Sequence, residues 1–406
     1  MFTKTCFKLG KLGLAAALAT LMAGQAPARA DEAFRNFVIK FYPVAAQAGI
    51  SKATYKAAFA GVNEPDPEVL RKAGFQPEFK TPIWEYMDSR VNPYTVRIGQ
   101  EMLHRYGSTL AAIERHFGVD RHILLAIWSM ESNYGAILSK EEKLHYVPQA
   151  LATLAYSDRK RSKYAQKQLI AALKILQSGD ITPRGLTGSW AGAMGHTQFI
   201  PTSYLLYGFD ADGNGKRDIW NSIPDALATS ANLLKQNGWV TGKTWGYEVA
   251  VPEGGQAYAG KTLTLAQWAK LGFLRPNGKG FKNGGDRAQL KMPAGANGPG
   301  FLMAKNFFVI KKYNAADTYA LAVGQLADQI AGYPGMRQSW PRPDGSLDIN
   351  EKFELQSRLK ELGYYEGEVD GNFGSGSKAA IASIQQRLGL QPDGEPSRRL
   401  LKALRQ

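Results

Sequence analysis

One carboxylate stands near the end of an almost wholly apolar stretch of the chain, residues 123–134. Asp120 is a residue type that caps helix starts, and Gly135 suits a left-handed position after a helix end, so we predict a helix between them. Glu131 would then lie in the last turn, where burial and the helix dipole both favour its protonated form. A general acid that works near neutral pH needs this property. We predict that Glu131 is the catalytic acid; the alternatives are a Glu paired with a basic residue or an exposed position past a core helix.

Oxygen-bearing side chains also recur at the spacing of a calcium-binding loop. Position twelve of this loop is Asn221, where a bidentate Glu is usual, and Asp225 is the candidate replacement. We predict a structural Ca²⁺ site, and the alternative is an Asx-rich turn. The predicted ligands are Asp210, Asp212, Asn214, the Lys216 carbonyl, Asp218 and Asp225, with Gly215 at the sharp turn.

Small residues dominate residues 185–201, where they would allow the backbone to approach a sugar closely or would form a tight turn between helices. Lys160 and Arg161 belong to a charge run at a helix start, which is either a solvated face or a grip for substrate carboxylates. The five histidines show no metal-ligand spacing. No motif for phosphate or nucleic-acid binding is present, so we expect no nucleic-acid partner.

The first 30 residues have the pattern of a secretory signal peptide, with three lysines before an apolar run and small residues up to Ala30. Cleavage after Ala30 would remove Cys6, the only cysteine, and would lower the formal net charge from +15 to +11. We expect a periplasmic protein without a membrane span. The positive charge favours a polyanionic partner; cell-wall glycan with peptide carboxylates is one, and nucleic acid or anionic lipid would satisfy the same charge argument.

Hydrophobic periodicity predicts a mainly helical large domain with a minor β-sheet, residues 31–335. Helices are expected within 31–59, 94–105, 108–117, 147–156, 160–177 and 315–330, a loop at 63–82, and strands within 245–251, 288–292 and 301–310. A linker at 336–346 and a small domain of three helices at 347–406 follow.

Several separated motifs, taken in order, resemble the membrane-bound lytic murein transglycosylase B family. They are Trp128 to Gly135, Ala191 to Pro201, the acidic loop up to Trp220, and Lys312 to Val323. The tail resembles a peptidoglycan-binding domain, through motifs such as Leu362 to Tyr365 and Val369 to Gly371. The resemblance implies a lysozyme-like catalytic domain that binds peptidoglycan glycan strands.

The family resemblance implies cleavage of the β-1,4 bond between N-acetylmuramic acid and N-acetylglucosamine without water. The muramyl C6 hydroxyl attacks instead and leaves a 1,6-anhydro end. Glu131 matches the lone catalytic Glu of the family, whereas ordinary glycosidases use two carboxyl groups. The substrate-binding positions that the resemblance implies are Tyr86, Lys160, Arg161, Ser189, Met194, Gln198, Tyr313, Asn314 and Tyr319.

Two other functions stay open: a muramidase that uses water, and a wall-binding protein without catalysis. The nature of the muramyl ends in a digest separates the first from a transglycosylase, and Glu131→Gln separates the second. We expect a monomer, no organic cofactor, and cell-wall synthases as candidate partners.

Overall fold

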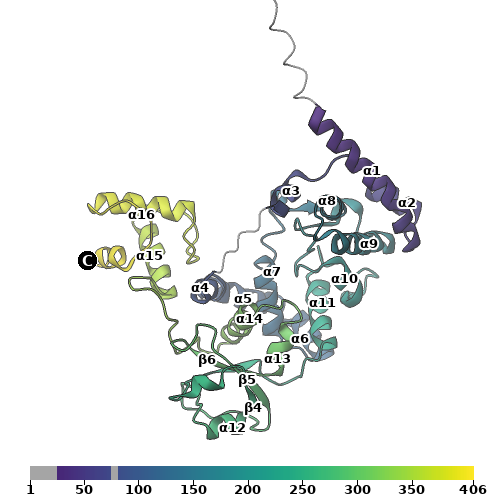
Figure 1. Ribbon diagram of the computed structural model, residues 1–406. Helices are drawn as coiled ribbons and strands as arrows, with labels where there is room; N and C mark the ends of the chain where they lie inside the picture. The colour runs from purple at the N-terminus through teal and green to yellow at the C-terminus, as the bar shows by residue number, and fades with distance from the viewer. Residues whose placement is uncertain (1–24, 75–80) are drawn as a thin grey trace, which may run out of the picture.

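The computed structural model describes residues 25–74 and 81–406, and the chain is mainly helical with a minor sheet, as predicted (Figure 1). Most of the predicted signal peptide, residues 1–24, lies outside the described residues. Within the described ranges, no helix combines the length and the apolarity that a bilayer crossing requires.

Five helices form one end of the large domain, at the top right of Figure 1. Helix α1 packs on α8 through Phe34 and Val38, which are buried at helical spacing, and α8 packs along α9. The helices are α1 (Gln25–Gln47), α2 (Lys52–Ala58), α3 (Pro67–Gly74), α8 (Val147–Ser157) and α9 (Ser162–Ser178).

The centre of the large domain is built around α7 (Arg121–Ser132) and α14 (Asp317–Ile330), which pack against each other. Most residues of both helices are buried, because neither has a wide polar face. Around this pair lie α4 (Ile83–Arg90), α5 (Pro93–Arg105), α6 (Gly107–Phe117), α10 (Pro201–Tyr207), α11 (Ile223–Gln236) and α13 (Lys305–Ile310).

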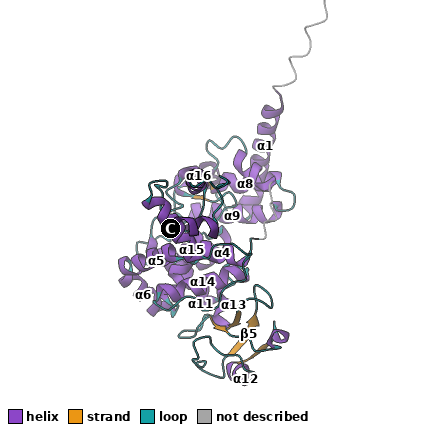
Figure 2. Cartoon of the chain, turned by 90° about the vertical axis from the view of Figure 1, so that its left-hand side faces the viewer, coloured by secondary structure: helices purple, strands orange, loops and turns teal. Residues whose placement is uncertain are grey.

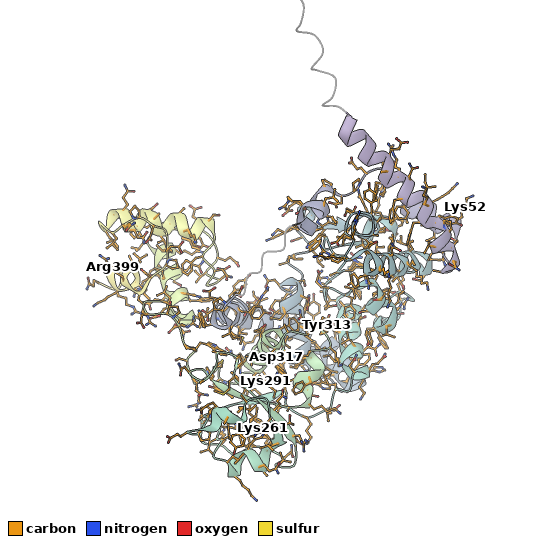
Figure 3. The ribbon with its side chains drawn as sticks, viewed as in Figure 1. Lys52, Lys261, Lys291, Tyr313, Asp317 and Arg399 are labelled. Carbon is orange, nitrogen blue, oxygen red and sulfur yellow. The ribbon has the colours of Figure 1, made fainter. Side chains whose placement is uncertain are left out.

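A four-stranded antiparallel sheet projects from the helical part, and its strands are orange in the lower part of Figure 2. Its strand order is β3-β6-β5-β4, and it has its own core around Trp268 and Phe273. Lys291 of β5 and Asp317 of α14, both labelled in Figure 3, form an ion pair of 2.8 Å that ties the sheet to the central helix. The elements are β3 (Gly246–Val249), β4 (Thr262–Thr264), α12 (Leu265–Lys270), β5 (Arg287–Lys291) and β6 (Gly300–Met303).

The tail forms a separate small core from α15 (Ile349–Glu361), α16 (Ser375–Arg387) and α17 (Arg398–Leu404). The segment 336–346 that precedes it is in contact with the large domain: Trp340 stacks on Phe301 with ring centroids 6.0 Å apart. Asp88 of α4, which is 6% exposed, accepts two hydrogen bonds of 2.7 Å from Arg342. Lys352 of α15 also binds this carboxylate, at 2.7 Å. These ion pairs hold the small domain against the helix that carries Tyr86.

Two predictions about local structure were wrong. The expected loop 63–82 contains α3, because Asp66 accepts hydrogen bonds from the first amides of this helix and Val69 is fully buried. The expected strand 301–310 ends at Met303, and α13 follows, since Phe307 and Ile310 reach the main core at helical spacing.

The helix that carries Glu131 begins as predicted, with the Asp120 side chain accepting a hydrogen bond from the His122 amide. It ends at Ser132, three residues before the predicted stop. Asn133 and Tyr134 both adopt positive φ, and the Tyr134 hydroxyl donates to the Thr95 carbonyl at 3.0 Å. This tertiary contact overrides the glycine as the terminator of the helix.

Candidate active site

Glu131 lies in the last turn of α7, and its carboxylate meets a tyrosine from a distant part of the chain. The Tyr319 hydroxyl, near the start of α14, donates to Glu131 Oε1 at 2.6 Å. Within residues 25–74 and 81–406, Glu131 takes part in no ion pair. The alternatives of a clamped Glu or a fully exposed one therefore do not describe its surroundings.

Burial dominates the protonation of Glu131. It raises the pKa of this carboxyl from 4.5 to about 7, while the Tyr319 hydrogen bond and the Arg90 charge act in the opposite direction. A group with this pKa can give and take a proton at neutral pH. Burial is thus the main cause of the raised pKa of Glu131.

Two tyrosines form a stacked wall beside this carboxyl. The rings of Tyr313 and Tyr319 lie 6.4 Å apart with an angle of 10° between their planes. The Tyr313 hydroxyl donates to the Thr197 carbonyl at 2.5 Å, which anchors the glycine-rich segment to the turn between α13 and α14. Burial raises the pKa of both tyrosines well above their ordinary value, so both hydroxyls stay protonated donors. Figure 3 labels Tyr313 in the central part of the molecule.

Helix α4 brings two further residues toward Glu131. Tyr86 is half-buried, and its ring lies under the Arg90 guanidinium, 5.9 Å from the centroid. The charge of Arg90 lowers the pKa of Glu131, and the charge of Glu131 raises that of Tyr86. Arg90 was not among the predicted site residues. The sequence does place this cation four residues after Tyr86, in the segment between Pro82 and Pro93, and residues at that spacing lie on one face of a helix.

The backbone of the glycine-rich segment, residues 185–201, packs closely against another part of the protein. A Cβ added at Gly195 would lie 2.4 Å from the Ile219 carbonyl oxygen, and φ at this residue is +68°. Met194 is fully buried beneath this turn, and Gln198 has a positive φ of 51°. Positive φ at a residue other than glycine is strained and is concentrated at functional sites. This geometry is that of a tight turn.

Three other predicted substrate contacts have local partners. The Ser189 hydroxyl accepts from the Ala193 amide at 3.1 Å, and Gln198 Nε2 donates to the Gly195 carbonyl at 2.9 Å. Asn314 is exposed, and its side chain accepts from the Ala316 amide at 3.1 Å just before α14. These polar groups are therefore held in fixed directions.

The two residues of the predicted basic pair, Lys160 and Arg161, differ in their contacts. Lys160 is exposed, and no ion pair forms at its ammonium within the described residues. Arg161 binds Asp158, donates Nη2 to the Ala73 carbonyl at 3.0 Å, and lies 5.3 Å from the Trp190 ring centroid. Its guanidinium is positioned by the fold, and its Nη1 is the remaining donor.

The acidic loop brings three of the predicted ligands together. Carboxylate oxygens of Asp210, Asp212 and Asp225 lie within 4.8 Å of one another. Asp225 is fully buried, and its oxygens accept the amides of Ala211 and Asp218, both at 2.8 Å.

Two further predicted ligands in this loop orient the backbone. Asp218 accepts the amides of Trp220 and Asn221, and the Asn214 side chain accepts the Lys216 amide at 2.9 Å. No cation of the described chain pairs with the cluster of three carboxylates. Oxygen donors of this kind fit Ca²⁺.

His196, one of the five histidines without metal-ligand spacing, lies beside α7. Its Nδ1 accepts from Trp128 Nε1 at 3.2 Å, and its carbonyl accepts from the Ser132 hydroxyl at 2.6 Å. Burial lowers the pKa of His196, which keeps the ring neutral. His196 therefore connects the glycine-rich segment to α7.

Two family models match the chain. The model described as transglycosylase SLT domain matches residues 33–328, and a peptidoglycan binding domain model matches residues 352–404. The first match covers most of the large domain, and the second covers the three helices of the tail.

Several known proteins are similar to the chain. Membrane-bound lytic murein transglycosylase B of Escherichia coli (strain K12) is 31% identical over 251 residues, which are 61% of this chain and 66% of the relative. The match thus spans just under two thirds of that relative. The crystal structure of SltB3 from Pseudomonas aeruginosa in complex with NAG-anhNAM-pentapeptide shows 42% identity, with 92% of this chain and 99% of that chain covered and a TM-score of 0.73. The Escherichia coli lytic transglycosylase Slt35 in complex with calcium shows 25% identity, with 74% and 92% covered and a TM-score of 0.60.

Proposed function

Because the chain belongs to the transglycosylase SLT domain family, we propose that it is a lytic transglycosylase that cleaves peptidoglycan between N-acetylmuramic acid and N-acetylglucosamine. The observation that carries this proposal is the Glu131–Tyr319 pair: one carboxyl group with a pKa of about 7, held by a tyrosine hydroxyl. The resemblance to the family implies a lone catalytic Glu, whereas the usual glycosidase mechanisms use two carboxyl groups.

The reaction then proceeds with one group acting twice. Protonated Glu131 gives its proton to the glycosidic oxygen as the bond from C1 of the muramyl unit breaks. The resulting carboxylate, which the Tyr319 hydroxyl stabilises, takes the proton of the C6 hydroxyl, and O6 bonds to C1. The product is a 1,6-anhydro end, no water is consumed, and Glu131 returns to its protonated form.

Labelled water tests this mechanism. Sacculi are digested by the full chain in water enriched in oxygen-18, and the muramyl ends are analysed by mass spectrometry. We expect anhydro ends that are one water lighter than reducing ends and carry no label, and Glu131→Gln should abolish them. Labelled reducing ends would show a muramidase, and unchanged digestion by Glu131→Gln would show that this carboxyl is not the catalyst.

Substrate contacts are proposed for the side chains around this pair. Tyr86, Tyr313 and Tyr319 would line the sugar subsites, and Met194 would support the turn beneath them. Ser189, Gln198 and Asn314 would offer hydrogen-bonding groups whose directions their local contacts fix. Lys160 and the free Nη1 of Arg161 would meet substrate carboxylates.

We also propose that the acidic loop binds a structural Ca²⁺. Asp210, Asp212 and Asp225 would hold the ion, and Asn214, Asp218 and the Lys216 carbonyl belong to the same loop. The support is the convergence of three carboxylates that no cation of the described chain neutralises, together with a relative solved in complex with calcium. The ion would stabilise the turn before α11 and would take no part in the reaction.

Calcium binding by this loop has a direct test. Added Ca²⁺ at about 100 times its Kd should stabilise the chelator-treated protein by about 2.7 kcal/mol, and Asp212→Asn should reduce this effect. Asp286→Asn, which removes a carboxylate outside the loop, is the control. An equal response of both variants would exclude the loop as the site.

The small domain of residues 347–406 is proposed to bind peptidoglycan, on the strength of its family match. Deleting it should reduce the fraction of the protein that sediments with purified sacculi. Export to the periplasm with cleavage after Ala30 is proposed from the signal pattern, and sequencing the N-terminus of the secreted protein tests it. A monomeric state and binding to cell-wall synthases stay predictions.

A further inference from the structure

A cavity lies at the ends of α7 and α14 that are remote from Glu131. It has a volume of about 650 Å³, and its lining includes His122 at the start of α7 and Asp328 near the end of α14. His122 and Glu131 are nine positions apart on α7, and Tyr319 and Asp328 are nine positions apart on α14. At the rise of an α-helix, the cavity and the Glu131–Tyr319 pair are therefore about 14 Å apart along the helices. The two helices thus carry the catalytic pair at one end and this cavity at the other.

The α14 side of the cavity offers hydrogen-bonding groups that the protein leaves largely unused. Gln325 is 6% exposed and lines the cavity, and its side-chain amide makes no hydrogen bond to any described residue. Asp328, one turn later, receives one hydrogen bond, from Trp245 Nε1 to Oδ2 at 3.1 Å. The Gln325 amide and the second oxygen of Asp328 are therefore available to a ligand in the cavity.

Asp328 also lacks a cation. It forms no ion pair within residues 25–74 and 81–406, and burial raises its pKa to about 7. The nearby charge of Asp120 acts in the same direction, and the charges of Arg275 and His122 oppose it. A ligand cation at Asp328 would therefore relieve an unfavourable charge in the folded protein.

Other elements line the same cavity with cations. Lys279 and Lys282 come from the segment between α12 and β5, and Arg337 follows α14. Within the described chain none of these three forms an ion pair, whereas Lys243 of the same lining is bound by Asp286 at 2.9 Å. The cavity therefore combines an acidic side with several free cations.

We propose that this cavity binds a short peptide that carries both a free ammonium group and carboxylates. The ammonium would bind Asp328 and the Gln325 carbonyl oxygen, and the carboxylates would bind Lys279, Lys282 and Arg337. The Asp328 carboxylate would repel a purely anionic ligand. A neutral sugar would leave the charges of Asp328 and the three cations without partners. The peptide stems of peptidoglycan have the required chemistry, so the proposal extends the proposed function to a second contact with the same substrate.

Calorimetric titration of the full chain with the pentapeptide of peptidoglycan, separated from its sugars and acetylated at its N-terminus so that only the side-chain ammonium is free, tests the proposal. We expect Asp328→Asn to weaken binding by about tenfold or more, because a hydrogen bond to a charged group is lost. Asparagine can still accept from Trp245, so this variant should fold. The double variant Lys279→Ser, Lys282→Ser should weaken binding too, while Lys270→Ser, an exposed lysine of α12 outside the lining, should not.

Modified peptides identify the contacts. Acetylating the ammonium should weaken binding to the unmodified chain but add little in Asp328→Asn, since both changes remove one interaction. Amidating the carboxylates should do the same for the double lysine variant. Binding that is undetectable, or unaffected by these variants, would overturn the proposal. Loss of peptide binding in Glu131→Gln would also overturn it, because the peptide would then bind beside Glu131 and not in this cavity. Digestion of sacculi by Glu131→Gln tests the proposed function separately.

Discussion

The buried carboxyl at residue 131 should make the protein less stable at high pH than at low pH, and Glu131→Gln should remove this cost. Burial raises the pKa of Glu131 from 4.5 in the unfolded chain to about 7 in the fold. The folded state therefore binds a proton that the unfolded state releases between these two values. The stability linked to this proton is fully present below pH 4.5 and is lost as the pH rises through about 7.

The size of the effect follows from the two pKa values. Their difference corresponds to about 3 kcal/mol, since one pKa unit is about 1.4 kcal/mol. Glutamine has nearly the same shape and can still accept the Tyr319 hydrogen bond, but it never carries the charge. At pH 4.5, Glu131→Gln should have the same free energy of unfolding as the native protein. At pH 8, its free energy of unfolding should be higher by up to about 3 kcal/mol.

Urea unfolding of both proteins at pH 4.5, 6 and 8, with fluorescence as the signal, measures this difference. Asp328 also has a pKa raised to about 7, but it is present in both proteins and cancels in the comparison. Glu101→Gln, an exposed change on α5, is the matched control. A gain in stability that is the same at pH 4.5 and pH 8 would refute the reasoning, because the carboxyl would then not be desolvated.

Three further changes probe the same framework. Tyr319→Phe removes the donor to Glu131, so the alkaline limb of the pH–rate profile should move up by about 1 to 2 pH units; an unmoved limb would contradict the 2.6 Å contact. Gly195→Ala should lower the free energy of unfolding by about 3 kcal/mol through contact with the Ile219 carbonyl, whereas Gly179→Ala, which also has positive φ but open space, should lose about 1 kcal/mol; equal losses would refute the steric argument. Asp88→Asn should cost about 3 kcal/mol and make the junction before residue 347 sensitive to protease, and unchanged cleavage would show that the ion pairs do not hold the small domain.

Local patterns predicted the helices well wherever the local signal and the tertiary contacts agree. Asp120 caps α7 as its residue type indicates, and Gly118 and Gly179 end α6 and α9 in the left-handed conformation. Long-range contacts decided the exceptions. Tyr134 ends α7 early through its bond to Thr95, and the burial of Phe307 turns a β-prone run into α13.

The site was only partly predictable for the same reason. Glu131 could be singled out from the contrast between a carboxylate and its apolar neighbours. Its contact with Tyr319 spans 188 residues, so no local rule reveals it, and only the family resemblance brought that tyrosine to notice. Arg90 was missed because α4 is short and bounded by prolines. The cavity at Gln325 and Asp328 depends on which helix ends meet, and this information is absent from any single segment.

The separation between Glu131 and Tyr319 has a consequence for the time at which the chain becomes active. While the ribosome is still making residues before Tyr319, the acid has no tyrosine beside it, and α7 can pack on α5, α6 and α11 but not on α14, its most extensive partner. The surroundings that raise the pKa of Glu131 are therefore complete only once α14 has been made, and a chain that stops before Tyr319 lacks both this hydrogen bond and the packing of that helix.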